Sequence, residues 1–277
     1  MTALEAVKRP LRRLRTEYRE LTGPLRGLPS ALIIGAQKGG TTFLFDHLVQ
    51  HPDVLPPLNK EIHYFDLNYT RGVTWYRARF PYSYQLRGRA VTIDASPYYL
   101  VHPQVPQRVP QLLPGAKLIV LLRNPVDRAF SHYQHEFRAG RESLSFPEAI
   151  ERESDRLAGE EARLRLEPAY YSYNHHRYSY MLRGVYIEQL RRWARHFHRS
   201  QFLVLQSECL FRDPAAGMVA VHGFLGLRAQ RLERYAPSYQ GNYQRGMSPD
   251  LRARLVSYFE PYNRELFQWL GEEFDWT

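Results

Sequence analysis

Cysteine is nearly absent from this sequence. Cys209 is the one cysteine among 277 residues, so a disulfide within the chain is excluded. No stretch approaches the roughly 18 consecutive apolar residues of a transmembrane helix, and the N-terminus carries no apolar run of the signal-peptide type. The scarcity of cysteine favours a reducing compartment. Because the sequence also shows no membrane anchor, we expect a cytoplasmic protein. Because hydrophobic residues make up 44% of the chain, disorder throughout is excluded as well.

Acidic residues are also scarce relative to basic ones. Asp and Glu number 28 against 38 Lys and Arg, which gives a net charge of +10. A nucleotide, an anionic glycan, a nucleic acid or an anionic membrane would suit this charge, although solubility alone would also explain it. No basic run recurs beside evenly spaced aromatic residues, so a general nucleic-acid-binding role is not indicated.

The positive charge is concentrated at the N-terminus, where residues 1–30 hold seven Lys/Arg and three Glu. Residues 4–21 favour a basic helix interrupted by Pro10, and residues 23–30 (GPLRGLPS) favour a linker. The helix could contact a membrane peripherally or remain a solvated tail. We therefore expect an arm and linker over 1–29 and one domain over 30–277. The oligomeric state stays open.

Apolar runs alternate with helical patterns along the domain. The expected strands are 31–35, 91–96, 117–123 and 201–210, and the expected helices are 42–50, 124–140, 185–197 and about 248–271. The charged segment 141–167 is expected to be helical and exposed. Short apolar strands separated by helices predict an α/β fold, a P-loop-like parallel sheet flanked by helices.

The turn after the first strand, GAQKGGTT at 35–42, is a candidate anion site, because backbone N–H groups gather where a glycine-rich turn opens a helix. Gly35 and Gly40 have the spacing of the ATP-type loop, but Thr41 stands where that loop has its lysine, and the lysine here is Lys38. Magnesium-dependent phosphoryl transfer therefore lacks a usual part. A P-loop kinase or NTPase is the alternative.

A second cationic position follows the third expected strand. In LLRNPVDRAFSHY (121–133), Arg123 ends the strand and Ser131 lies about two helical turns later. The carboxyl ends of parallel strands line the ligand crevice of such sheets, and an arginine there can bind a phosphate through two N–H groups. Together with the first turn, this arrangement suggests a ligand with two separate phosphate groups.

These segments resemble the sulfotransferases that use 3′-phosphoadenosine 5′-phosphosulfate (PAPS), above all the heparan sulfate glucosaminyl 3-O-sulfotransferases and their bacterial relatives. GAQKGGTT resembles the family's 5′-phosphosulfate loop, and LLRNPVDRAFSHY its 3′-phosphate segment. Similar segments are HPDV (51–54), NKEIHYFD (59–66), RGVYIEQLRRW (183–193) and YFEPYNRELFQWLGEEFDW (258–276). The resemblance spans about 30–277 and implies an enzyme of the EC 2.8.2 class that releases adenosine 3′,5′-bisphosphate.

The resemblance also implies roles for individual residues. Lys38 stabilises the leaving phosphate, and Glu61 is the general base. His63 is a second base, a group that orients Glu61, or a structural histidine. The implied PAPS-binding residues are Lys38, Gly39, Gly40, Thr41, Thr42, Arg123 and Ser131, with Tyr186 and Arg245 as further candidates that could instead be a core residue and a solvated one. No metal is required, and the sequence shows no metal-ligand cluster.

Two departures from the resemblance concern the acceptor. Ala95 stands where the heparan sulfate enzymes carry a lysine, and residues 239–250 are short and lack the cysteines of their disulfide-closed loop. The tract 169–180 (AYYSYNHHRYSY) suits a sugar or phenolic acceptor, because ring faces stack and hydroxyls form hydrogen bonds. The acceptor group is a hydroxyl or an amine. A saccharide, a lipid-linked sugar and a phenol stay open, and a bacterial source is expected.

Overall fold

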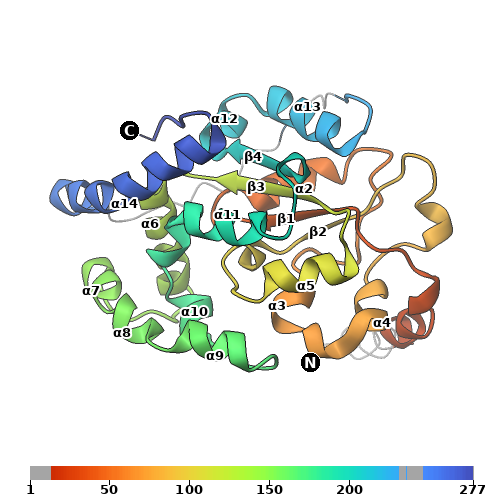
Figure 1. Ribbon diagram of the computed structural model, residues 1–277, viewed down its shortest axis with the longest axis horizontal. Coiled ribbons are helices and arrows are strands. Elements are labelled where there is room, and N and C mark those ends of the chain that lie inside the picture. Colours follow the sequence, from red (N-terminus) through yellow and green to blue (C-terminus); the bar gives the residue numbers. More distant parts are fainter. Residues whose placement is uncertain (1–13, 231–234, 236–245, 277) are drawn as a thin grey trace, which may run out of the picture.

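The computed structural model describes residues 14–230, Tyr235 and 246–276. Its centre is a parallel sheet in the order β2-β1-β3-β4 (Figure 1). The strands are β1 (Ala31–Gly35), β2 (Ile93–Ala95), β3 (Lys117–Leu122) and β4 (Phe202–Gln206). Ala31 of β1 pairs with Ile93 on one side and Lys117 on the other. The predicted α/β fold with a parallel sheet flanked by helices is confirmed.

The strands are mostly apolar because helices cover both faces of the sheet (Figure 1), with Asp94 of β2 as a buried exception. Side chains alternate along β1. Leu32 and Ile34 pack into one core with α5 (Val105–Leu112), α11 (Tyr186–Ala194) and α14 (Pro249–Leu270), while Ala31 and Ile33 pack into another with α2 (Thr41–Leu48) and α13 (Pro214–Leu225). A third cluster joins α6, α7 and α14 at the side of the sheet. The carboxyl ends of the strands are thus held rigidly, and the loops that follow them can carry a site.

Helices of varied length connect and surround the strands. Their bounds are α2 (Thr41–Leu48), α3 (Tyr64–Leu67), α4 (Gly72–Arg77), α5 (Val105–Leu112), α6 (Pro125–Arg138), α7 (Phe146–Glu151), α8 (Glu153–Leu157), α9 (Glu160–Leu166), α10 (Tyr173–Arg177), α11 (Tyr186–Ala194), α12 (Ser207–Arg212), α13 (Pro214–Leu225) and α14 (Pro249–Leu270). Along the described ranges, no helix combines the length and the apolarity needed to cross a bilayer.

Two expectations for these elements are corrected by the structure. The strand predicted over 201–210 ends at Gln206, and α12 begins at Ser207, whose hydroxyl donates to the Gly39 carbonyl at 2.6 Å. The segment 141–167 is helical but divided into α7, α8 and α9, and it is not uniformly exposed, because Glu142, Phe146 and Glu153 are buried. Those buried positions fix it to α6 and to the chain near Tyr180.

The described part of the N-terminal arm lies against the domain. Residues 14–21 are helical, and a short 3₁₀ helix, η1 (Gly23–Leu25), packs on α4. Arg26 is 3% exposed and donates to the Phe80 carbonyl. A boundary at residue 29 or 30 stays a prediction, but residues 14–26 contact the domain instead of extending from it.

Candidate active site

The glycine-rich turn joins β1 to α2 at the carboxyl edge of the sheet. A Cβ on Gly39 would lie 2.6 Å from the Leu121 carbonyl oxygen, and Gly40 has a φ of +93° that favours glycine. No side chain caps the N-terminus of α2, so its first N–H groups face the turn. Thr41 is buried and Thr42 is exposed there. The backbone N–H groups of the turn can therefore contact an anion, and the tight backbone requires glycine at positions 39 and 40.

Lys38 lies within this turn among other cations. Burial lowers the pKa of its ammonium, and the charges of Arg138 and Arg123 act in the same direction. Arg128 of α6 is fully buried, and its Nε and Nη1 have no hydrogen-bond partner in the described structure. Buried positive charge of this kind needs a compensating anion, so the residues at this edge fit a phosphate-bearing ligand.

Arg123 follows β3 directly, and its Nη1 lies 3.5 Å from the Lys38 carbonyl oxygen. Its own carbonyl accepts a hydrogen bond from the Tyr186 hydroxyl at 2.9 Å. Tyr186 is 1% exposed, so it belongs to the core and holds the Arg123 backbone. Ser131 lies on α6 and is buried. Lys38 and Arg123 thus meet at one edge, while Arg245 lies outside the described residues.

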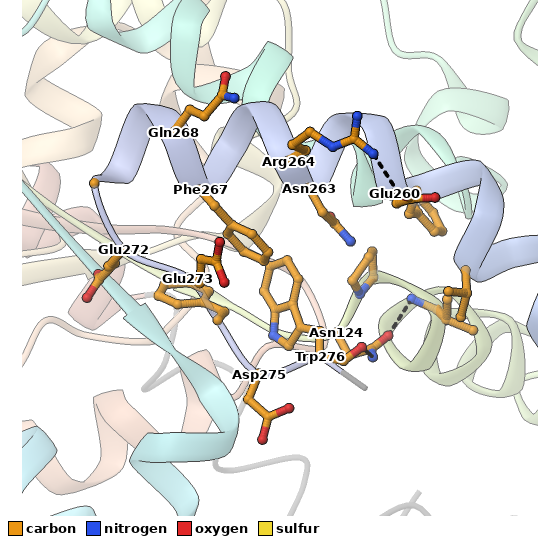
Figure 2. A pocket seen from close by; sticks show the side chains of 16 residues that line it. Asn124, Glu260, Asn263, Arg264, Phe267, Gln268, Glu272, Glu273, Asp275 and Trp276 are labelled. Carbon is orange, nitrogen blue, oxygen red and sulfur yellow. Dashed lines mark hydrogen bonds and ion pairs between the residues drawn. The ribbon is translucent and has the colours of Figure 1, made fainter.

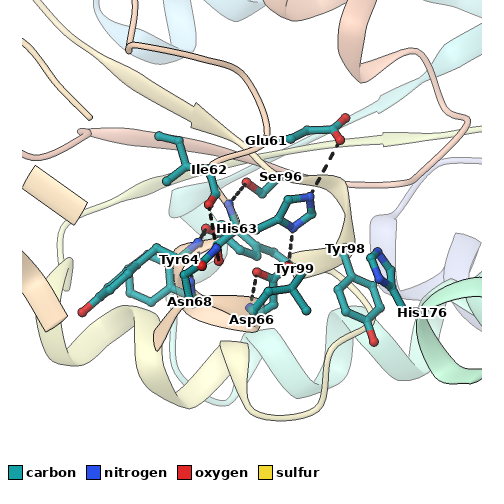
Figure 3. A network of polar contacts seen from close by, with 12 residues as sticks. Glu61, Ile62, His63, Tyr64, Asp66, Asn68, Ser96, Tyr98, Tyr99 and His176 are labelled. Carbon is teal, nitrogen blue, oxygen red and sulfur yellow. Dashed lines mark hydrogen bonds and ion pairs between the residues drawn. The ribbon is translucent and has the colours of Figure 1, made fainter. Parts of the chain in front are cut away.

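The segment that carries Glu61 is held by the end of β2. The Glu61 N–H donates to the Ala95 carbonyl at 3.0 Å, and the His63 N–H donates to the Ser96 hydroxyl at 3.1 Å (Figure 3). Ser96 in turn donates to Asp94, which also accepts from Tyr76 and Tyr99. Burial raises the pKa of Asp94 to about 6 despite these donors. The hydrogen bonds position Glu61 and His63 at the same edge as the glycine-rich turn.

Four charged groups, Lys60, Glu61, His63 and Asp66, form a chain at this point, and Figure 3 shows the last three. Lys60 Nζ lies 2.6 Å from Glu61 Oε1, and His63 Nε2 lies 3.7 Å from Glu61 Oε2. The opposite ring nitrogen of His63 bonds Asp66 at 2.7 Å, and the Asp66 side chain is fully buried. Glu61 is therefore flanked by two cations, one of which is fixed by a buried carboxylate.

This chain sets the protonation of both central groups. Contact with His63 lowers the pKa of Glu61 to about 2 against the opposing effect of burial, and Lys60 adds to the lowering. Burial alone would lower the pKa of His63, but the charge and hydrogen bond of Asp66, together with Glu61, raise it to about 10. Near neutral pH the site holds an ionised carboxylate beside an imidazolium.

The backbone is unusual at the same residues. Among the described residues other than glycine, Lys38, Glu61 and His63 are those with positive φ, at 70°, 59° and 54°. Such conformations cost free energy in residues with a side chain and persist where the surrounding structure enforces them, often at functional sites. The conformations therefore single out the residues that the sequence resemblance assigns to catalysis.

Aromatic residues border Glu61 and His63 on the outer side. His176 of α10 stacks on Tyr98 with ring centroids 4.4 Å apart, and it lies 6.2 Å from the His63 ring. The Tyr171 hydroxyl bonds His176 Nδ1 at 2.9 Å. Burial, with the charge of Arg183, lowers the pKa of His176 to about 2, so its ring is neutral. Part of the tract 169–180 thus faces the charged chain.

Several residues at this edge were not identified from the sequence. Asp66 could have been found, because His63 and Asp66 have the (i, i+3) spacing of neighbours on one helix face. Arg183 begins the segment 183–193 that resembles the family, but no role was assigned to it. It is buried, donates to Gln37 in the turn and to the His175 and His176 carbonyls, and so links the turn to α10. Its role follows from contacts between segments distant in sequence.

A cavity of about 950 Å³ lies between α14, the C-terminal segment and the start of α6 (Figure 2). Its lining includes four carboxylates, Glu260, Glu272, Glu273 and Asp275, and one arginine, Arg264, which pairs with Glu260 at 2.7 Å. This excess of negative charge is unfavourable for a bisphosphate. Across the described ranges, no three potential metal ligands are grouped.

Comparison with known proteins identifies the family. The chain is 32% identical over 274 residues to human heparan sulfate glucosamine 3-O-sulfotransferase 6, an alignment that covers 91% of this chain and 74% of that protein. It is also similar to a crystal structure of a sulfotransferase from Alicyclobacillus acidocaldarius, with a TM-score of 0.69, 31% identity and coverage of 90% of this chain and 98% of that one. Residues 28–248 match the model of the sulfotransferase domain. With its parallel sheet and cationic turn, the chain belongs to the sulfotransferase family and is an enzyme of the sulfotransferase class.

Proposed function

We propose that this sulfotransferase uses PAPS as its donor and sulfates a hydroxyl group of a saccharide. The observation that carries the proposal is the meeting of Lys38, Arg123 and Glu61 at one sheet edge, with cations on the donor side and an ionised carboxylate on the acceptor side. The human relative named above is a heparan sulfate glucosamine 3-O-sulfotransferase, which supports a saccharide acceptor here.

The donor site follows from the turn and the start of α6. The N–H groups of Gly39 to Thr42, with the Thr41 and Thr42 hydroxyls, would hold the 5′-phosphate, and Arg123 with Ser131 would hold the 3′-phosphate. Tyr186 contributes by fixing the Arg123 backbone. PAPS supplies the sulfuryl group when bound. The partly buried Lys38 and the buried Arg128 offset the negative charge of such a ligand.

The chemistry assigned to the chain is proton removal and charge stabilisation. As the acceptor oxygen forms its bond to sulfur, its proton passes to Glu61, and the bond between sulfur and the phosphate oxygen breaks. The electron pair remains on that phosphate oxygen, where Lys38 stabilises it. His63 orients Glu61 and is held by Asp66. A carboxylate with a pKa of about 2 is a weak base, so the proposal requires the bound acceptor to weaken the contacts of Glu61 with His63 and Lys60.

The acceptor side supports a sugar with few negative charges. Tyr171 and His176 offer ring faces and hydrogen-bonding groups near Glu61, with the buried Tyr98 ring stacked behind His176. Ala95 is 1% exposed and supplies only its carbonyl to the Glu61 N–H, so it adds no cation for a sulfated glycan.

Calorimetry with adenosine 3′,5′-bisphosphate and with ATP plus magnesium tests the donor. We expect micromolar binding of the bisphosphate alone, and preferential binding of ATP would refute the proposal. Labelled PAPS with a panel of saccharides then tests transfer.

Glu61→Gln should lower turnover by about a hundredfold or more, in line with loss of a general base, while bisphosphate affinity stays near that of the wild type. An unchanged rate would exclude Glu61 as the base.

A further inference from the structure

The N-terminal helix presents its apolar side chains to solvent. Leu14, Tyr18, Leu21 and Leu25 are 61%, 57%, 82% and 65% exposed. Their spacing of four, three and four residues places the first three on one face of the helix and continues the stripe to η1. Tyr84 on the neighbouring loop is 62% exposed. A surface helix normally buries such a stripe, so the orientation here is the reverse of the usual one.

Polar side chains on the opposite face fix this orientation. Arg19 donates to the Ala78 carbonyl at 2.6 Å and to the Phe80 carbonyl at 2.8 Å. Glu20 pairs with Arg79 at 3.3 Å. Because these contacts bind the polar face to the chain after α4, the helix cannot turn its leucines inward without breaking them. The helix lies at the edge of the molecule beside α4 (Figure 1).

A basic cleft lies beside the exposed stripe. Arg15, Arg19 and Arg26 line this cleft of about 500 Å³ together with residues 55–58, Pro81, Tyr82, Tyr84 and Gln85. Arg15 is exposed, whereas Arg19 and Arg26 are turned toward the domain by their hydrogen bonds to the Ala78 and Phe80 carbonyls. Residues 1–26 of the sequence hold seven Lys/Arg against three Glu. The N-terminal segment therefore combines exposed apolar side chains with a net positive charge.

We propose that this surface, defined as residues 14–26 with Tyr84, docks onto an anionic lipid bilayer. The leucines and tyrosines enter the interfacial layer, and the exposed Arg15 pairs with a headgroup phosphate, while the basic residues that precede it in the sequence add to the electrostatic attraction. A second copy of the chain is a poorer occupant, because it would bring like charges together. Pro10 and Pro24 also leave room for only about two heptads between them, which is short of the three or four that sustain a coiled coil.

Docking would place the catalytic segment near the membrane. The cleft is lined by Leu55, Pro56, Pro57 and Leu58, and the Leu58 N–H donates to the Arg79 carbonyl at 2.7 Å. Glu61 follows Leu58 by three residues, at most about 11 Å of extended chain. An acceptor carried by a lipid would thus be held close to Glu61. The docking itself is independent of the donor and acceptor proposed above.

Co-sedimentation of the full chain with phosphatidylcholine vesicles, with and without phosphatidylglycerol, tests this proposal. We expect binding to the anionic vesicles at least about tenfold stronger than to the neutral ones, and weaker in 0.5 M salt, because each exposed charge near the surface contributes about 1 kcal/mol. The double variant L21S/L25S should lose a further tenfold or more, since burial of one leucine contributes about 1.5–3 kcal/mol.

A matched control removes an equally exposed leucine elsewhere. Leu166 on α9 is 80% exposed, and Leu166→Ser should bind vesicles as the wild type does. Thermal melting confirms that both variants fold, which is expected because the leucines are exposed. Equal binding to neutral and anionic vesicles, or equal loss in Leu166→Ser, would overturn the proposal. It would also fail if light scattering showed a wild-type dimer that L21S/L25S dissociates while vesicle binding is absent.

Discussion

At the scale of single residues, the protonation of His63 decides how the site responds to pH. Asp66 is buried and raises the pKa of His63 to about 10, while the pKa of Glu61 is lowered to about 2. Neither group then titrates between about pH 4 and 9 in the free enzyme. Because kcat/KM reports the free enzyme, His63 and Glu61 should add no limb to its pH profile in this range.

Asp66→Asn removes the charge that keeps His63 protonated. The lowering of the His63 pKa by burial is then opposed by Glu61 without Asp66, so the pKa of His63 falls from about 10 and the cation is lost at a lower pH than in the wild type. We expect kcat/KM at pH 8 to fall about tenfold or more while activity near pH 5 is better preserved. The pH profile of Asp155→Asn, whose side chain is 71% exposed, serves as the control. Superimposable wild-type and Asp66→Asn profiles would show that the His63 charge has no role.

Some site residues could be predicted from the sequence and others could not, for a physical reason. Lys38, Arg123 and Glu61 each lie in or beside a local pattern, a glycine turn, a strand end or a resembling segment, so they could be proposed in advance. Arg183 and His176 lie in segments that the sequence singled out, 183–193 and 169–180, but their individual positions follow from contacts between chain segments far apart in sequence. The positive φ of Glu61 and His63 likewise results from the hydrogen bonds to Ala95 and Ser96.

At the scale of elements, the strongly apolar strands and the long helices were predicted well. β1 spans the expected residues, and α6, α11 and α14 differ from expectation by a few residues at their ends. The errors fall where tertiary contacts decide the local conformation. β4 gives way to α12 at Ser207, although the strand was expected to continue to Leu210. Helical geometry lets Leu210 pack in the core with α2 and α13, and the Ser207 hydroxyl donates to the Gly39 carbonyl.

The glycine-rich turn allows a test of its close packing. Gly39→Ala would place a Cβ 2.6 Å from the Leu121 carbonyl oxygen and 3.0 Å from that of Ala36, and neither backbone atom can move freely. We expect a loss of about 1–3 kcal/mol in the free energy of unfolding, measured by denaturant titration, and weaker binding of adenosine 3′,5′-bisphosphate. Gly115→Ala, with no atom within 4 Å of its Cβ, should change neither. Equal effects in the two variants would contradict the tight turn.

At the scale of the whole molecule, the C-terminal segment closes over the start of α6. Asn124 donates to the Trp276 carbonyl at 3.0 Å, and Glu208 accepts from both the Asn124 N–H and the Trp276 indole. The Trp276 ring lies 5.9 Å from that of Tyr186, whose hydroxyl bonds the Arg123 carbonyl. The last residues of the chain therefore support the residue proposed to bind the 3′-phosphate.

Trp276→Ala should reveal this support. Loss of a partly buried tryptophan should cost about 1–3 kcal/mol in stability, which corresponds to a fall of several degrees in Tm for a domain of this size. If the segment also positions Arg123, adenosine 3′,5′-bisphosphate will bind several-fold more weakly and raise the Tm of the variant less than that of the wild type. Glu272→Ala, an exposed change in the same segment, controls for proximity. A bisphosphate-induced Tm increase equal to that of the wild type would limit Trp276 to stabilising the fold.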